Sequence, residues 1–158
     1  MLKKGVLLIA ISIALVACKE TAKSDAKTGN KMNDLVAKSK ASELGPAIGT
    51  YKNLLNVYVA ETSRLGSWED IGYEAPMRKI ATGKSESDTF IYEDFSANGM
   101  VGVKASNKEQ LSQCPQGSVW KISCKKLKDE ANYMSIACQC DVDEKCAYLT
   151  PFFERLCP

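Results

Sequence analysis

Six cysteines give the C-terminal part of this 158-residue chain its greatest capacity for chemistry. All of them lie in the last 45 residues, at Cys114, Cys124, Cys138, Cys140, Cys146 and Cys157. In an oxidising compartment, an even set of thiols predicts up to three disulfides. Six cysteines can be joined in fifteen different sets of three pairs, and the sequence does not choose among them. A metal site with four cysteine ligands is the competing interpretation. The lack of paired C-x-x-C motifs disfavours it, so we expect disulfides.

The sequence contains no histidine. Histidine is the commonest general base and the commonest nitrogen ligand for metals. Its absence excludes Ser-His and Cys-His nucleophile systems and the usual catalytic zinc sites. Carboxylate-based catalysis is left, but no residue pattern indicates it. We therefore expect a protein that is not an enzyme and that has no cofactor.

Three acidic side chains near the C-terminus are a weak candidate for a cation site. Asp141, Asp143 and Glu144 lie within four residues, and carboxylate oxygens are preferred ligands of Ca²⁺. No twelve-residue calcium-loop pattern accompanies them. A solvated acidic turn is therefore the favoured interpretation.

Two aromatic residues stand out in the segment GSWEDIGYEAP over 66–76. Trp68 and Tyr73 lie there between glycine and proline residues, which predicts an ordered loop. Their rings could contact a ligand, as a platform for a sugar. The more frequent role of such a pair is to pack the loop onto the core.

The N-terminal residues have the composition of a secretory signal. Lys3 and Lys4 precede an apolar run over 6–17, which ends at Cys18. This run is too short for a membrane-spanning helix, which needs about twenty residues. We therefore expect export rather than a transmembrane segment.

The closing residues of that signal, Leu15-Val16-Ala17-Cys18, resemble the lipobox of bacterial lipoproteins. The resemblance implies that the signal peptide 1–17 is removed and that Cys18 receives diacylglycerol and palmitate. The partner would then be the membrane, reached through acylated Cys18. Because Lys19 follows it rather than Asp, the chain resembles lipoproteins of the outer membrane, on the periplasmic or surface face of the cell envelope.

The chain beyond residue 17 is about one domain long. Residues 18–33 have almost no large apolar side chains, which predicts a flexible tether, and 34–158 form the domain. Without Lys3 and Lys4 the chain has 19 basic and 19 acidic residues. This balance provides no electrostatic basis for binding nucleic acid.

One long amphipathic helix is expected at the start of the domain. Its apolar positions recur at steps of four and three, at Leu44, Ile48, Tyr51, Leu55, Tyr58, Thr62 and Leu65. Gly66 should end it. Proline fits the first turn of a helix but kinks an interior. Hence either the helix starts near Ser42, or a first segment from Asn33 bends at Pro46.

A polar loop is expected over 78–88, and strand patterns follow it. Two apolar runs, 90–92 and 100–103, flank Asn98-Gly99, a pair that favours a type I′ hairpin turn. Asn107, with Gln110 three residues later, has the pattern of a capping box and predicts a short helix over 108–113.

A second hairpin is expected from 118–125 and 131–140, with a polar loop between them. Period-two alternation places one set of side chains on a common apolar face: Trp120, Ile122, Cys124, Met134, Ile136, Cys138 and Cys140. Cys124 could therefore pair with Cys138 or with Cys140. The apolar residues over 147–153 should seal the domain.

The order of these elements resembles type IV pilins and pseudopilins. Residues 40–76 look like the second half of a pilin helix followed by the G-x-W..I-G-Y..P element of a group of pilin-like proteins. The resemblance extends over residues of about 40–158. It implies an α+β fold in which a long N-terminal amphipathic helix packs on an antiparallel sheet, with a disulfide-rich C-terminal segment.

The chain differs from pilins in the part that builds filaments. Residues 3–9 resemble a prepilin leader, but Ala10 occupies the position where a glutamate is usual. The apolar first half of a pilin helix is replaced by the lipobox and the tether. We expect a non-enzymatic, lipid-anchored envelope protein that acts in adhesion or protein interaction. The alternatives are a minor pilin or pseudopilin of a filament or type II secretion assembly, and a carbohydrate-binding module that contacts polysaccharide.

Overall fold

The computed structural model describes residues 29–76, 78–128 and 133–157. Two helical segments come first, over 29–41 and in α2 (Leu44–Thr62). Six strands follow: β1 (Arg78–Ala81), β2 (Lys84–Glu86), β3 (Phe90–Ala97), β4 (Met100–Asn107), β5 (Val119–Lys128) and β6 (Met134–Val142). The last elements are two short 3-10 helices, η1 (Glu144–Leu149) and η2 (Glu154–Leu156).

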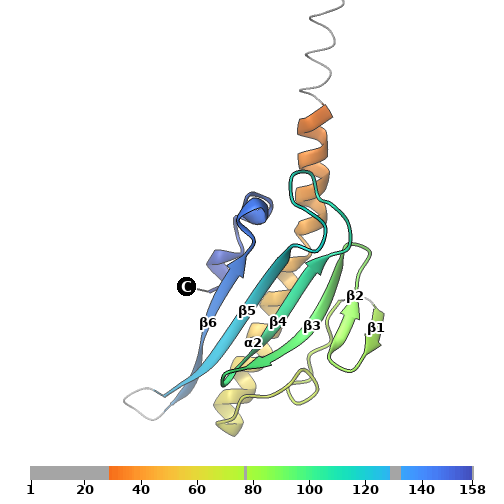
Figure 1. Cartoon of the computed structure of the whole chain (residues 1–158). Helices are drawn as coiled ribbons and strands as arrows, with labels where there is room; N and C mark the ends of the chain where they lie inside the picture. The colour runs from red at the N-terminus through yellow and green to blue at the C-terminus, as the bar shows by residue number, and fades with distance from the viewer. Residues whose placement is uncertain (1–28, 77, 129–132, 158) are drawn as a thin grey trace, which may run out of the picture.

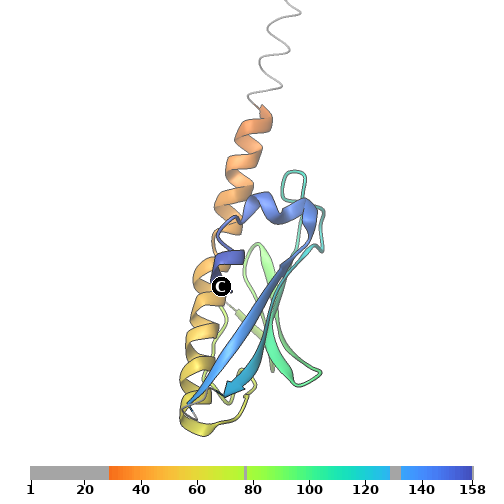
Figure 2. The same ribbon diagram turned by 90° about the vertical axis from the view of Figure 1, so that its left-hand side faces the viewer.

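All six strands form one antiparallel sheet in the order β1-β2-β3-β4-β5-β6. Each strand therefore pairs with its neighbour in the sequence (Figure 1). Helix α2 covers one face of the sheet, as the view along the sheet in Figure 2 shows. This confirms the expected α+β class, in which a long N-terminal helix packs on an antiparallel sheet.

The long helix is interrupted at residues 42 and 43. Pro46 is the third residue of α2, where the missing N–H removes no helical hydrogen bond. The structure combines parts of the two expected forms. A first helical segment is present, as in the second form, but α2 starts beside Ser42 with Pro46 in its first turn, as in the first form, and the helix is not interrupted at Pro46. The interruption is attached to the sheet because the Glu43 carboxylate accepts hydrogen bonds from the hydroxyls of Ser87 and Tyr92.

The first helical segment begins within the expected tether. Residues 29–33 are helical and exposed, whereas the rest of the tether and the signal peptide lie outside the described residues. The segment projects beyond the ends of the strands (Figure 1). Asp34 accepts a hydrogen bond from Ser112, and Lys40 pairs with Glu109. Within the described residues, no helix has the length and apolar character needed to span a membrane.

Helix α2 ends earlier than the apolar pattern predicts. Ser63 adopts a left-handed conformation (φ 57°), and its N–H donates to Val59 O at 2.9 Å. The helix therefore stops at Thr62, which is exposed, and Leu65 lies outside it. The expected core stripe is otherwise confirmed, with these residues buried: Leu44, Ile48, Tyr51 and Leu55.

Side chains of the sheet alternate between a face covered by α2 and an open face. The predicted common face of β5 and β6 is confirmed, since Ile122 pairs with Cys140 and Cys124 with Cys138. Ile122 and Cys124 are buried in the core, and the two β6 cysteines are partly buried and pack against it. The open face is polar. There Glu93 pairs with Lys84 at 2.8 Å, and with Lys104 at 3.6 Å.

The first predicted hairpin is confirmed, but the segment before it is not a loop. Asn98 and Gly99 both have positive φ, 53° and 72°, as a type I′ turn requires. Residues 78–88, expected as a polar loop, instead contain β1 and β2. All four residues of β1 are exposed, so this strand has no apolar alternation from which it could be recognised.

The predicted helix over 108–113 is wrong. Asn107 ends β4 and is buried. Its side-chain amide donates to Glu109 O (2.8 Å) and Pro115 O (2.7 Å) instead of accepting a hydrogen bond from a helical N–H. These bonds hold the connection as a loop, in which Leu111 and Cys114 exchange backbone hydrogen bonds.

The six C-terminal cysteines form three disulfides, as expected. The pairs are Cys114–Cys146, Cys124–Cys138 and Cys140–Cys157. The second joins residues that face each other across β5 and β6, and the other two attach the tail after β6. Apolar tail residues, among them Leu149 and Phe153, are buried in the core, so the tail seals the domain as predicted.

Candidate functional site

The loop after α2 is the part of the described chain in which predicted ligand residues line a cavity. It starts at Gly66, where a Cβ would lie 2.8 Å from Asp70 Cβ and 2.9 Å from Tyr58 Cε1. The close approach therefore requires glycine. Asp70 then accepts hydrogen bonds from the N–H and the hydroxyl of Ser67, both at 2.8 Å. These hydrogen bonds lower the pKa of Asp70, the backbone bond most strongly.

The two aromatic residues of this loop pack against the core. Trp68 and Tyr73 are 4% and 5% exposed, and their ring centroids lie 5.1 Å apart in an edge-to-face arrangement. The Tyr73 hydroxyl donates to Ala47 O in α2 at 3.0 Å, and burial raises the pKa of Tyr73. Neither ring forms an exposed platform, so the packing interpretation describes their main role.

Asp94 joins the loop to the sheet. Its carboxylate accepts a hydrogen bond from the Trp68 backbone N–H at 3.2 Å, and its own N–H donates to Gly83 O at 2.7 Å. Burial raises the pKa of Asp94, although the hydrogen bonds from the Trp68 and Phe95 N–H groups oppose that shift. Asp94 thus fixes both the aromatic loop and the turn between β1 and β2.

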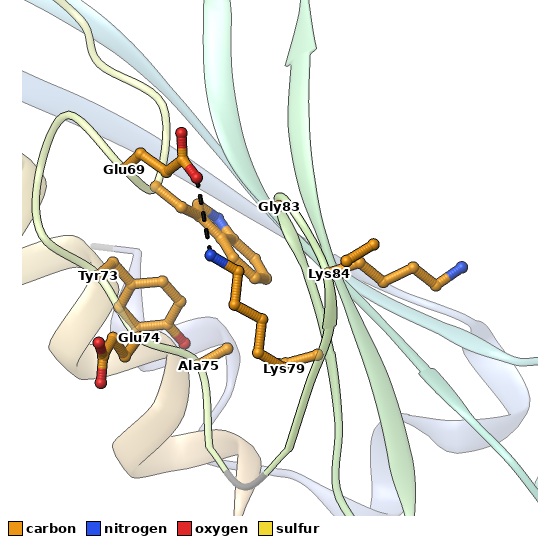
Figure 3. A pocket seen from close by; sticks show the side chains of 10 residues that line it. Glu69, Tyr73, Glu74, Ala75, Lys79, Gly83 and Lys84 are labelled. Carbon is orange, nitrogen blue, oxygen red and sulfur yellow. Dashed lines mark ion pairs between the residues drawn. The ribbon is translucent and has the colours of Figure 1, made fainter.

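A cavity of about 190 Å³ lies between the aromatic loop and the β1–β2 hairpin (Figure 3). Trp68 and Tyr73 line it from the loop, and Ser85 lines it from β2. Glu69 and Lys79 form an ion pair at 3.7 Å, which connects the loop to β1 beside the cavity (Figure 3). Both of these side chains are more than half exposed, so the pair is weak and can open at little cost.

Two buried polar groups of the lining residues have no hydrogen-bond partner in the described structure. They are Trp68 Nε1 and Ser85 Oγ. The other tryptophan differs, since Trp120 Nε1 donates to Thr150 Oγ1 at 2.8 Å. A buried donor without a partner costs about 1 to 3 kcal/mol. A ligand or ordered water in the cavity would lower this cost, which makes the cavity a candidate binding site.

The acidic tail residues do not converge. Asp143 accepts a hydrogen bond from the Val119 N–H at 2.9 Å, and Asp141 accepts one from the Gln139 side chain at 3.0 Å. Glu144 is exposed at the start of η1. In the described part of the chain, no three acidic, cysteine or histidine side chains are grouped to hold a metal ion. The geometry therefore gives the calcium candidate no support.

The described residues include only some of the predicted site residues. Cys18, the predicted lipidation site, lies outside them. The sequence does not predict Ser85 and Lys79 as binding-site residues. The composition of 78–88 predicts a polar loop, and a single serine does not by itself indicate a ligand-binding site. The Thr82-Gly83 pair was the one available indication of a turn, and Gly83 has φ +64°.

In comparisons with known proteins, no protein-family model, no curated protein and no solved structure matches this chain.

Proposed function

We propose that this chain is a non-enzymatic, lipid-anchored protein of the bacterial cell envelope, with a pilin-like domain that acts in adhesion or protein interaction. The observation that carries the proposal is the helix packed on an antiparallel meander whose C-terminal end is disulfide-rich. This is the order of elements that a pilin-like domain would have. The lipobox-like residues ending at Cys18 supply the anchor in this proposal.

The disulfides favour a location outside the cytoplasm. Three bridges join all six cysteines of the domain, and such bridges form and persist in oxidising compartments. The seventh cysteine, Cys18, then has no partner among them and is available for acylation. The residue after it, Lys19, favours the outer membrane in this proposal.

The projecting helical segment supplies a surface for partner contact. Met32, Leu35 and Val36 are 60%, 64% and 50% exposed, and their i, i+3, i+4 spacing places them on one side of the helix. Large apolar side chains grouped on one face are typical of interaction sites. The segment begins within the predicted tether, so in this proposal it would face the crowded envelope next to the anchor.

Processing of the N-terminus tests the proposal. In cells treated with globomycin, which inhibits lipoprotein signal peptidase, the acylated precursor should accumulate. The Cys18→Ala variant should neither be acylated nor cut before residue 18. Intact-mass analysis of the mature protein, with and without reduction, reports the cleavage site, the acyl chains and the three disulfides. Normal processing in the presence of globomycin would overturn the proposal.

The second candidate is a minor pilin or pseudopilin. The exposed apolar side of 29–41 favours it, because a helix that assembles with others needs such a side. In that case prepilin peptidase would cut after Gly5, and the mature chain would keep the apolar run over 6–17. The mass of the mature N-terminus therefore separates the two candidates in one measurement.

Partner contact by the projecting segment is tested separately. Leu35→Asp should abolish chemical cross-links between the full chain and its neighbours in intact cells, because it places a charge on the contact side. Leu127→Asp, at a 43% exposed position on β5, is the matched control and should leave the cross-links unchanged. Equal cross-linking in both variants would remove the segment from the proposal.

A further inference from the structure

One cavity of the described structure combines enclosure with unpaired polar groups. The cavity beside 29–41 and the one beside Pro46 and Thr50 are larger, about 310 and 340 Å³. Neither is lined by a residue that has a buried polar atom without a hydrogen-bond partner. The cavity between the aromatic loop and the β1–β2 hairpin is lined by two, Trp68 and Ser85. We propose that it binds a single neutral sugar ring, such as the terminal unit of a surface glycan.

The size of the cavity fits one six-membered ring. Its volume is about 190 Å³, somewhat more than an engineered protein cavity of roughly 150 Å³ that holds benzene. A disaccharide is too large for it. The site therefore accepts an end or a branch of a glycan rather than the middle of a linear chain.

The buried part of the lining selects a ligand with hydroxyl groups and no charge. Trp68 Nε1 can only donate a hydrogen bond, whereas Ser85 Oγ can donate and accept. The ring of Tyr73 adds an apolar wall. A sugar hydroxyl can accept from the indole N–H while a neighbouring hydroxyl pairs with Ser85. A charged group would be buried there without a counter-ion, which is costly.

The rim of the cavity is balanced in charge. Glu69 and Glu74 lie on the loop side, and Lys79 and Lys84 on the hairpin side (Figure 3). Lys79 pairs with Glu69, whereas the Lys84 side chain points away from the cavity and pairs with Glu93 on the open face of the sheet (Figure 3). The charges of Glu69 and Lys79 cancel, so this pair does not attract an ionic ligand. Both carboxylates and ammonium groups can hydrogen-bond to sugar hydroxyls.

The exposed ion pair beside the cavity provides the entrance. Both buried polar atoms expose almost no surface in this structure, so a ligand reaches them only when side chains that line the cavity shift. The Glu69 and Lys79 side chains are 63% and 69% exposed, and such pairs contribute little to stability. Their separation opens the cavity without disturbing Tyr73, which is fixed to α2 by its hydroxyl.

The two tryptophans of the chain allow a direct test by NMR. The full chain is labelled with ¹⁵N and held in a detergent without a sugar headgroup. Methyl β-glucoside, methyl β-galactoside and N-acetylglucosamine are then titrated singly to about 100 mM, far above a millimolar dissociation constant. At least one should shift the Trp68 indole signal in a saturable way. The Trp120 indole, which already donates to Thr150, should not move.

Two serine variants supply the matched control. Ser85→Ala should weaken binding about tenfold, the loss expected for one hydrogen bond to a neutral group. Ser123→Ala should leave binding unchanged, because Ser123 is also buried with an unpaired hydroxyl but does not line the cavity. A thermal melt of each variant checks that both are folded.

Three results would overturn the proposal. The first is that none of the three sugars moves the Trp68 signal, which would mean that the cavity holds only water. The second is that glucuronate, a charged sugar of similar size, binds while the neutral sugars do not. The third is that both folded serine variants bind equally well.

Discussion

The two ends of the sheet are held by different forces. At the β5–β6 end, three disulfides connect the strands and the tail within 44 residues, 114–157. At the β1–β2 end, the described contacts are hydrogen bonds, exposed ion pairs and aromatic packing, such as Trp68 with Tyr73. The cavity between the aromatic loop and the β1–β2 hairpin lies at this second end, where its rim includes an exposed ion pair.

This difference shows where the molecule can change shape. Cross-links restrict the unfolded chain and favour a compact native end, whereas a hairpin of three- and four-residue strands contributes little burial of its own. Binding sites are frequently found in the less stable parts of a domain. The β1–β2 end therefore suits ligand entry, and the β5–β6 end suits the role of scaffold.

The largest expected effect comes from the buried bridge at the covalent end. Cys114 and Cys146 are fully buried and enclose the longest disulfide loop, with a sequence separation of 32. The double variant Cys114→Ala/Cys146→Ala should lose about 4 kcal/mol of unfolding free energy, measured by urea unfolding followed by circular dichroism.

The bridge between β6 and the tail provides the control for that experiment. Cys140 and Cys157 are less buried and their separation is 17. Their double alanine variant should therefore lose less, about 3 kcal/mol. A larger loss from this pair than from Cys114 and Cys146 would contradict the importance assigned to the buried bridge.

The next effect concerns the turn at the other end. Gly83 has φ +64°, and a Cβ there would lie 3.0 Å from Asp94 Cβ. Gly83→Ala should cost about 1 to 2 kcal/mol, because side chains other than hydrogen disfavour this conformation. Gly49→Ala in α2 meets no atom within 4 Å and should raise stability by about 0.5 to 1 kcal/mol. Thermal unfolding that shows equal shifts would disprove the turn argument.

A smaller effect is expected where the aromatic loop meets α2. Tyr73→Phe removes the hydrogen bond to Ala47 O and should cost about 1 kcal/mol. Tyr51→Phe is the matched control, because the Tyr51 hydroxyl is buried without a partner in the described structure. That variant should be neutral or slightly more stable. If both variants lose the same free energy, the hydroxyl of Tyr73 does not hold the loop.

The smallest effect involves the open face of the sheet. The hydrogen bond from Lys84 is the largest cause of the lowered pKa of Glu93, and Lys104 adds to it. A carboxyl with a lowered folded-state pKa stabilises the protein above its unfolded pKa of about 4.3, and this contribution is lost as the pH falls through the folded value. Because the Glu93 side chain is 34% exposed and solvent screens its ion pairs, Glu93→Gln should cost about 0.5 kcal/mol or less at neutral pH.

Acid unfolding checks that sign. The difference in unfolding free energy between the parent and Glu93→Gln should be present at neutral pH and low salt. It should shrink as the pH falls below the unfolded pKa of about 4.3 and disappear once the carboxyl is protonated in the folded state as well. A difference that grows as the pH falls would show that the lysines do not act on this carboxyl.

The elements with strong local signals could be predicted from the sequence. Asn98-Gly99 determines its hairpin because both residues accept positive φ, and the alternation of Trp120, Ile122 and Cys124 defines the core face of β5. By contrast, β1 is exposed at all four positions and shows no alternation. Asparagine is a frequent N-cap residue, but the Asn107 side-chain amide donates hydrogen bonds to the carbonyl oxygens of Glu109 and Pro115 and does not cap a helix.

Only half of the candidate site could be predicted. Trp68 and Tyr73 were recognisable because aromatic residues in a short Gly- and Pro-flanked segment are conspicuous. Ser85 and Lys79 were not, since their role depends on how the β1–β2 hairpin folds back on the loop. A cavity is a property of packing between distant segments, so no local pattern reports it.

The concentration of cysteines in the last part of the chain has a consequence for the order in which the domain can fold. No cysteine occurs between Cys18 and Cys114, so the helix and β1 to β4 can assemble before any thiol of the domain has emerged. Because β5 and β6 form a hairpin, Cys124 and Cys138 meet as soon as these strands pair, within microseconds for a typical hairpin. The tail can then supply Cys146 and Cys157 to the two cysteines left. Among the six cysteines of the domain, incorrect pairing is therefore confined to the final segment of the chain.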